Sequence, residues 1–197
     1  MPIDSVSMLT GRIRALRSDR FTPVLVAIDG GSGAGKSTFA LKVGLETGAN
    51  VIDGDDFYAG GTAAVWDALS PAEKAGHCID WRRQRPVLEA LARGEPASWR
   101  PYDWEADDGR LLEQAVFYEP APVIILEGVY SARPELADLF DLLVLYDAPD
   151  EVRRQRIDDR DGEDNRTEWN QRWEEAETWY FTRVMPPAAF DLVLPAG

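Results

Sequence analysis

Cysteine, histidine and long hydrophobic runs are scarce in this sequence of 197 residues. The single cysteine, Cys78, excludes a disulfide within the chain and is typical of a reducing, cytoplasmic setting. No apolar run approaches the roughly 20 residues of a membrane-spanning helix, and residues 1–20 lack the apolar centre of a signal peptide. The single histidine, His77, has no neighbours that would make a metal site or a catalytic triad, so it and Cys78 are predicted loop residues. We therefore expect a cytoplasmic protein without a membrane partner.

Positive charge is also in short supply. The chain has 21 Lys and Arg against 35 Asp and Glu, which gives a formal net charge of −14. This balance argues against nucleic acid as a partner, and it means that any anionic ligand must be held by local groups. Hydrophobic residues make up 45% and charged residues 28%, which is a globular composition. The length fits one domain over residues 1–197 with a core of ordinary size.

Short apolar runs alternate with segments of helical composition after a leading helix within residues 1–20. This alternation predicts an α/β fold in which helices cover both faces of a five-stranded parallel sheet. The segment 94–122, rich in Pro, Trp and Gly, interrupts the rhythm and is predicted to be an irregular insertion or a small hairpin. The predicted strands are 24–28, 49–53, 123–128, 142–147 and 190–194. The predicted helices are 36–47, 84–93, 149–160 and 165–184.

A glycine-rich stretch, "GGSGAGKS", lies between the first of these strands and the helix that follows it. It matches the phosphate-binding loop, in which glycines let successive backbone N–H groups surround a phosphate without Cβ clashes. Lys36 would reach the outer phosphates, and the Ser37 hydroxyl is a ligand suited to Mg²⁺. The stretch therefore predicts a site for the phosphates of a nucleotide with Mg²⁺, and by itself it leaves a kinase, a GTPase and a motor protein open. The predicted nucleotide-binding residues are Gly30, Gly31, Ser32, Gly33, Ala34, Gly35, Lys36, Ser37 and Thr38.

Three carboxylates follow the next predicted strand in "VIDGDDFY", namely Asp53, Asp55 and Asp56. Ligands of open α/β sheets bind at the carboxyl ends of the strands, so these side chains are predicted to face the phosphate loop. A carboxylate in that place could accept the proton of an attacking hydroxyl. The alternative is an acidic, solvated turn, which we expect to describe at least one of the three.

The sequence resembles the uridine kinase-like branch of the P-loop small-molecule kinases over about residues 22–195. The resemblance implies a three-layer α/β/α P-loop kinase fold with an Arg-bearing lid at about 150–168 and a small acceptor-side insertion. It implies ATP-dependent phosphorylation of a hydroxyl group, with a nucleoside as the leading acceptor. Besides the phosphate loop it rests on "DDFY" at 55–58, with Asp56 where the family has Ser, and on "IDWRRQRPVLEALARGEPASWRPYDW", "VIILEGVY" and "DAPDEVRRQRIDDRD".

The resemblance also implies catalytic and metal-site roles. Asp55 falls where the family has its catalytic base. Glu127 closes the apolar run "VIIL", where an acidic residue is costly unless it serves a site, and the family's Glu orders the water shell of the metal. The implied magnesium residues are therefore Ser37, Glu127 and Asp55. Lys36 and the lid residue Arg160 complete the implied catalytic set.

The lid sequence "EVRRQRIDDRD" puts Arg153, Arg156 and Arg160 on one face of a helix. Such a face, closed over ATP, would neutralise charge on the transferring phosphoryl group. Arg160 matches the family best, and Arg156 is a predicted nucleotide contact. The alternative for any one of these arginines is pairing with acidic residues of the same helix.

Five residues are implied or expected to contact the acceptor. Tyr58, Asp80 and Tyr102 match the family's positions at the sugar and base: Asp80 could accept hydrogen bonds from two adjacent hydroxyls and Tyr102 could stack on a base. Core packing is the alternative for the two tyrosines. Trp104 is expected to line the pocket. Asp107 stands where the family often has a His, and its carboxylate would suit the amino group of cytidine or adenosine, or a cationic acceptor, better than the carbonyl of uridine.

Trp169, Trp173, Ala176 and Tyr180 recur at helical spacing and are predicted to be a buried stripe rather than a base-stacking ladder.

Two functions other than a nucleoside kinase stay open. One is a kinase of another polyol or of a natural-product hydroxyl. The other is a nucleotide-binding regulatory switch, although the Asn-Lys-x-Asp motif that reads guanine is absent from the sequence. The expected partner is a small-molecule hydroxyl acceptor, and a homo-oligomer is left open.

Overall fold

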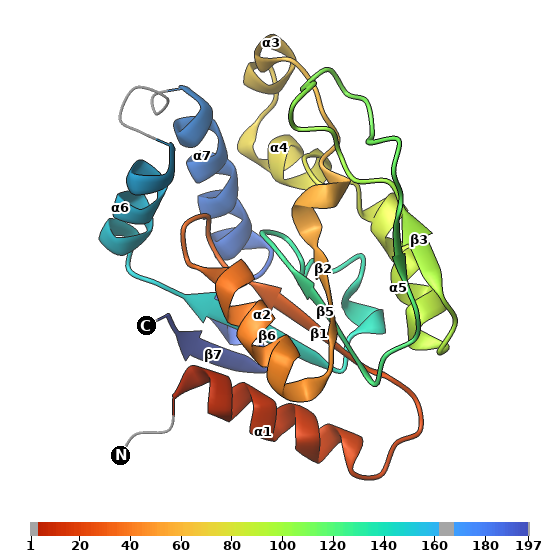
Figure 1. The fold of residues 1–197 in the computed structure, drawn as a ribbon. Helices are drawn as coiled ribbons and strands as arrows, with labels where there is room; N and C mark the ends of the chain where they lie inside the picture. The colour runs from red at the N-terminus through yellow and green to blue at the C-terminus, as the bar shows by residue number, and fades with distance from the viewer. Residues whose placement is uncertain (1–3, 162–167, 197) are drawn as a thin grey trace.

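A five-stranded parallel sheet forms the centre of the computed structural model, which describes residues 4–161 and 168–196 (Figure 1). The strand order is β2-β5-β1-β6-β7, so β1 lies in the middle between β5 and β6. The predicted α/β class and parallel sheet are therefore confirmed. The strands are β1 (Val24–Asp29), β2 (Asn50–Asp53), β5 (Val123–Glu127), β6 (Leu142–Asp147) and β7 (Leu192–Pro195).

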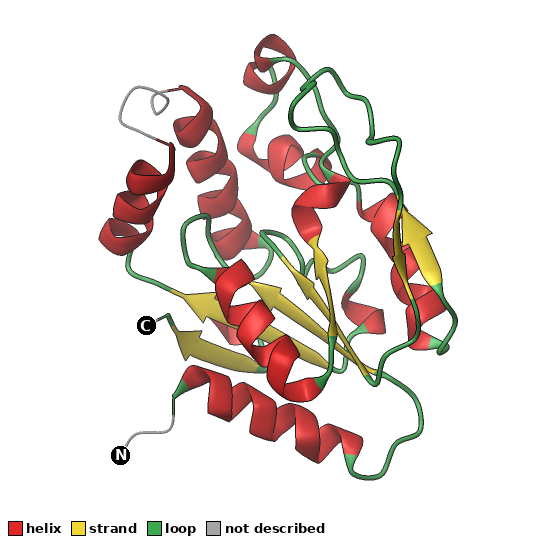
Figure 2. Ribbon diagram, in the orientation of Figure 1, coloured by secondary structure: helices red, strands yellow, loops and turns green. Residues whose placement is uncertain are grey.

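Helices cover both faces of the sheet, which gives the three layers seen in Figure 2. Helices α1 and α2 pack on one face, where Leu9, Ile13 and Phe39 join the core. Helices α5 and α7 pack on the other face through residues that include Leu88 and Tyr180. The helices are α1 (Ser5–Arg17), α2 (Lys36–Thr47), α3 (Ala63–Asp67), α4 (Pro71–His77), α5 (Trp81–Ala92), α6 (Asp150–Asp161) and α7 (Glu168–Arg183).

The central strand β1 shows why the apolar runs in the sequence are continuous. All six of its residues are buried. Val24 and Val26 point into the core under α1 and α2, whereas Leu25 and Ala27 point into the core on the opposite face. A strand covered on both sides has no solvent-facing positions, so apolar and polar residues do not alternate along it.

Two helices, α3 and α4, were not predicted. A capping box starts α4: the Ser70 hydroxyl accepts from the backbone N–H of Glu73, and the Glu73 carboxylate accepts from the backbone N–H of Ser70. Because α4 ends at His77, the prediction that His77 lies in a loop was wrong, whereas Cys78 follows the helix as its buried C-cap.

The predicted insertion contains a small antiparallel sheet made by β3 (Ala97–Trp99) and β4 (Val116–Tyr118). The predicted lid coincides with α6 and the start of α7, and its residues 162–167 lie outside the described residues. Both segments flank the carboxyl edge of the main sheet (Figure 1). They therefore frame the edge at which the phosphate loop lies.

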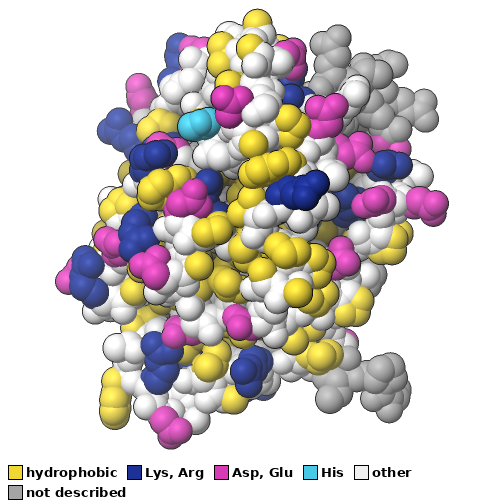
Figure 3. Space-filling model, turned by 180° about the vertical axis from the view of Figure 1, so that it is seen from behind, with side chains coloured by type: hydrophobic (Ala, Val, Ile, Leu, Met, Phe, Trp, Pro, Cys, Tyr) yellow, Lys and Arg dark blue, Asp and Glu magenta, His cyan; other side chains and the backbone are white. Residues whose placement is uncertain are grey.

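The face seen in Figure 3 carries acidic and basic side chains interspersed with apolar ones, rather than gathered into one charged area. Among the described residues, every helix is too short or too polar to cross a lipid bilayer. The cytoplasmic setting inferred from the sequence stays a prediction.

Candidate active site

The glycine-rich loop leaves β1 at Asp29 and enters α2 at Lys36. Its backbone has positive φ at Gly30, Gly33 and Gly35, which glycine adopts without strain. A Cβ on Gly33 would collide with the carbonyl oxygen of Arg153, so the loop also needs glycine because α6 lies directly against it. The Lys36 ammonium turns back over the loop and donates to the Gly31 carbonyl at 3.1 Å. The result is the curved backbone shape that surrounds a phosphate in nucleotide-binding proteins.

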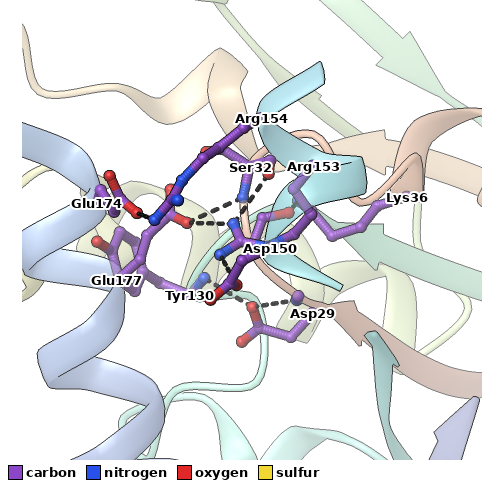
Figure 4. A network of polar contacts seen from close by, with 11 residues as sticks. Asp29, Ser32, Lys36, Tyr130, Asp150, Arg153, Arg154, Glu174 and Glu177 are labelled. Carbon is purple, nitrogen blue, oxygen red and sulfur yellow. Dashed lines mark hydrogen bonds and ion pairs between the residues drawn. The ribbon is translucent and has the colours of Figure 1, made fainter. Parts of the chain in front are cut away.

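Asp29, the last residue of β1, is fully buried and ties three parts of the site together. Its carboxylate accepts from the backbone N–H groups of Gly30 at 2.8 Å, Tyr130 at 3.0 Å and Ala132 at 3.0 Å. It also accepts the hydroxyl of Tyr180 in α7 at 2.9 Å. Burial raises the pKa of Asp29 to about 6, although these hydrogen bonds favour the ionised form. Figure 4 shows Asp29 between the phosphate loop and Tyr130.

A group of carboxylates lies at the carboxyl edge of the sheet. Asp53 and Glu127 are paired neighbours at the ends of β2 and β5. Glu127 is 3% exposed, and burial together with the adjacent Asp53 raises its pKa to about 7, while a hydrogen bond with Ser37 acts in the opposite direction. Among residues 4–161 and 168–196, no three His, Cys, Asp or Glu side chains are arranged to hold a metal ion by themselves. A metal here would therefore need ligands such as the Ser37 hydroxyl, water or a bound phosphate.

Asp55 lies in the short 3₁₀ helix Gly54–Phe57 that follows β2, and the Asp53 side chain accepts its backbone N–H at 2.9 Å. The Asp55 carboxylate is open to solvent at the cleft but enclosed by protein on its other sides. Desolvation by these walls and the charge of Asp53 raise its pKa to about 6, whereas Lys36 and Arg160 lower it. Asp55 thus lies within electrostatic reach of the phosphate-loop lysine and of the lid arginine.

The lid helix α6 contacts the phosphate loop through two arginines. Arg156 donates to the Ala34 carbonyl at 2.9 Å, and Arg153 donates to the Ser32 carbonyl at 3.0 Å. Arg153 also pairs with Asp150 of its own helix and with Glu177 of α7 (Figure 4). The pairing alternative that the sequence left open therefore applies to Arg153.

Two adjoining cavities open beside the phosphate loop, one of about 440 Å³ between α6 and α7 and one of about 350 Å³ above Asp55. We call the second the acceptor cavity. Of the predicted site residues, Ser32, Asp55, Tyr58, Trp104 and Arg160 line the acceptor cavity together. The residues shared by both cavities are Ser32, Arg160, Trp169, Trp173 and Glu177.

Three predicted acceptor contacts lie outside the lining of the acceptor cavity. Asp80 caps α5, where its side chain accepts the backbone N–H of Arg82 at 3.1 Å. Tyr102 is 2% exposed, packs edge-on against Tyr58, and donates its hydroxyl to Asp107 at 2.8 Å. The packing alternative therefore describes Tyr102 in this structure, and Asp107 contacts Tyr102.

Several residues of the cavity wall were not predicted from the sequence. Ala176 and Tyr180 are buried and Trp173 packs partly buried against the core, as expected, but Trp169 is 37% exposed, so the stripe prediction was wrong for Trp169; both tryptophans line the two cavities. The remaining residues of the acceptor cavity that were missed are Cys78, Ile79, Val129, Tyr130 and Glu177. The sequence does hold one signal for Glu177. This acidic residue directly follows Ala176 in the predicted apolar stripe, where a carboxylate is costly unless it has a partner or serves a site.

The sheet order, the phosphate loop and the lid helix define the fold of a P-loop kinase. A fructose transport system kinase candidate from Silicibacter sp. shares this fold with a TM-score of 0.68 at 20% identity, over 97% of this chain and 99% of the other. In sequence, the chain is a homologue of curated uridine kinases. No family model matches the chain.

Two of these uridine kinases indicate the extent of the similarity. The one from Deinococcus deserti is 29% identical over 151 residues, which are 74% of this chain and 68% of the relative. The one from Halobacterium salinarum is 30% identical over 142 residues, which are 69% of this chain and 61% of the relative. About a third of each relative's length is therefore not matched by this chain.

Proposed function

We propose that the chain is an ATP-dependent kinase that transfers the γ-phosphate to a hydroxyl of a small molecule, with a nucleoside as the leading acceptor. The observation that carries this proposal is the place of Asp55. This carboxylate opens onto a cavity of about 350 Å³ beside the phosphate loop and lies within electrostatic reach of Lys36 and Arg160. The names of the curated relatives support the nucleoside.

The residues of the loop fit a nucleotide. Positive φ at Gly33 and Gly35 turns the backbone around the space that a phosphate would fill, and α2 directs its positive end there. Lys36, Thr38 and Arg156 would contact the phosphates. Bound Mg²⁺ would screen the charge of the phosphates.

The donors at this edge fit magnesium as well. A buried carboxylate with a raised pKa, Glu127, lies beside the Ser37 hydroxyl. Ser37 would bind the ion, and Glu127 and Asp55 would act on its water shell, because no three carboxylates of the described chain form a cage. Loading with the ion would keep Glu127 ionised.

In the reaction we propose, Asp55 takes the proton of the acceptor hydroxyl. With a pKa of about 6 it is ionised at neutral pH and yet basic enough to accept that proton. Lys36 and Arg160 would stabilise the negative charge that develops on the transferring group. The tryptophans around the cavity would exclude water from it.

A second acceptor class, another polyol, is favoured by one observation. Asp80, Tyr102 and Asp107, which the nucleoside hypothesis assigns to the sugar and the base, do not line the acceptor cavity. Tyr58 and Trp104 do line it, and they stack on each other with ring centroids 4.9 Å apart. An acceptor that needs an aromatic wall but no base reader would fit this arrangement.

Release of ADP with a panel of acceptors tests the proposed function. The panel contains ribonucleosides, deoxynucleosides, sugars and polyols that carry amino groups, and ATP with Mg²⁺ alone gives the background. We expect strong stimulation by at least one hydroxyl compound. Slow turnover whatever compound is added would instead support the regulatory switch. A preference for uridine over cytidine would contradict the expectation, drawn from the sequence, that the Asp107 carboxylate favours an acceptor with an amino group.

A further inference from the structure

Tyr130 has an unusual backbone conformation. It lies three residues after Glu127, in the loop that leaves β5, and its φ is +68°. A bulky side chain is rarely found in this left-handed region, because its Cβ approaches the following carbonyl oxygen. Such a conformation is strained and persists where the surroundings enforce it, often at a functional site.

The surroundings that enforce it are Asp29 and Tyr180. The carboxylate of Asp29 accepts the Tyr130 backbone N–H at 3.0 Å, and the same oxygen accepts the N–H of Gly30 at 2.8 Å (Figure 4). The Tyr180 ring meets the Tyr130 ring edge-on, with centroids 4.8 Å apart, while the Tyr180 hydroxyl donates to Asp29 at 2.9 Å. One buried carboxylate therefore fixes Tyr130 and the start of the phosphate loop relative to each other.

The side chain held in this way belongs to the wall of the acceptor cavity. Tyr130 is 2% exposed, and its hydroxyl has no hydrogen-bond partner among the described residues. Burial raises the pKa of this hydroxyl, and Cys78 and Glu177, which raise it further, line the same cavity. A buried hydroxyl without a partner is unfavourable, and an oxygen of a ligand in the cavity would supply the missing hydrogen bond.

We propose that Tyr130 determines acceptor specificity by forming a hydrogen bond, through its hydroxyl, with an oxygen of the acceptor other than the one that is phosphorylated. The proposal rests on the proposed kinase function. Asp29 is then a positioning residue, because it holds the backbone of Tyr130 at a fixed place relative to the phosphate loop. The acceptor class that follows carries at least two oxygens, as polyols and nucleosides do, and an apolar alcohol with a single hydroxyl would be a poor acceptor.

The test is Tyr130→Phe, which removes one oxygen and keeps the ring. For the best acceptor of the wild-type panel we expect kcat/KM to fall about tenfold, chiefly through KM, as loss of one such hydrogen bond predicts. The affinity for ATP with Mg²⁺ should not change. Tyr118→Phe is the matched control, because its hydroxyl donates to the Val51 carbonyl at 2.6 Å, and Tyr118 does not line the acceptor cavity.

Acceptor analogues that lack one oxygen each make the test specific. Removal of the oxygen that Tyr130 binds should cost the wild-type enzyme about tenfold in kcat/KM and should cost the Tyr130→Phe variant almost nothing. An unchanged acceptor KM in an active variant would overturn the inference and leave the proposed function standing. Equal losses for every analogue would also overturn it, since they indicate a structural role. If no acceptor stimulates the wild-type enzyme, the proposed function itself fails, and the inference fails with it.

Discussion

Glu177 in α7 accepts the backbone N–H of Ser32 in the phosphate loop at 2.9 Å, and it accepts the hydroxyl of the same serine as well. Its carboxylate also pairs with Arg153 of the lid helix at 3.4 Å. The loop, the lid and α7 thus meet at one carboxylate. A second ion pair, between Arg154 and Glu174, joins the same two helices.

These two ion pairs make a matched comparison. The side chains of Arg153 and Glu177 are 18% and 6% exposed, and those of Arg154 and Glu174 are 62% and 47% exposed. We expect Glu177→Ala to lower the free energy of unfolding by about 2–3 kcal/mol, because it removes two hydrogen bonds to Ser32 and the more buried of the two acidic partners of Arg153. Glu174→Ala should cost less than about 1 kcal/mol, as exposed pairs do. Urea denaturation of both variants measures the difference, and equal losses would contradict it.

Lys36 is the second residue for which the structure supports a specific expectation. It is 8% exposed and lies over the phosphate loop. Lys36→Ala should weaken binding of ATP with Mg²⁺ by about tenfold or more, because a hydrogen bond to a charged group contributes about 1.5–3 kcal/mol. Lys42→Ala, on the exposed face of the same helix, is the control. Calorimetric titration gives both affinities, and an unchanged affinity in Lys36→Ala would remove the loop from the proposed site.

The parts of the fold that could be predicted are those that depend on the pattern of residues within a short segment of the sequence. Continuous apolar runs gave β1, β5 and β6, and the glycine spacing gave the phosphate loop, because burial on both faces and tight turns each restrict the residues allowed. The helix α4 was missed although Ser70 and Glu73 form a capping box. That signal is short, and the helix it starts has only 7 residues.

The cavity wall could be predicted only in part, because it depends on contacts between distant segments. Trp169 and Trp173 have the spacing of a buried stripe, and only the position of α7 beside the cavities makes both of them part of the cavity wall and leaves Trp169 37% exposed. Tyr130 carries no local signal of its left-handed backbone, since the carboxylate of Asp29, 101 residues earlier, enforces it. Residues that work through tertiary contacts are therefore the ones that sequence patterns miss.

Ionisation of the buried Glu127 carboxylate should lower the free energy of unfolding of the ligand-free protein above about pH 7. Its pKa is raised to about 7 by burial, so the folded protein holds a proton that the unfolded chain has already lost, and stability falls as pH rises from about 4.5 to about 7. Glu127→Gln should not lose stability in this way, because the glutamine side chain does not ionise. We expect its Tm to exceed that of the wild type by about 5 °C at pH 8, and we expect the gain to shrink at pH 5.

Thermal unfolding at the two pH values measures the effect of Glu127, and the exposed residue Glu113 provides the control in Glu113→Gln. Glu127→Gln should also lower the kinase activity, because Glu127 is proposed to act on the water shell of the metal. A Tm gain that is the same at pH 5 and pH 8 would show that ionisation of Glu127 is not the cause.

Asp55 is the residue on which the proposed chemistry depends. Asp55→Asn should reduce turnover by about 10²–10⁴-fold, the usual contribution of a general base. In the wild type, kcat/KM should rise with pH through about pH 6, because the base works only when it is ionised and its pKa is about 6. That rise should disappear in the variant. Asp56→Asn is the control, since Asp56 accepts the indole N–H of Trp99 at 2.6 Å, and a much smaller loss is expected. If Asp56→Asn is the inactive variant and Asp55→Asn keeps the pH-dependent rise, the base has been assigned to the wrong carboxylate.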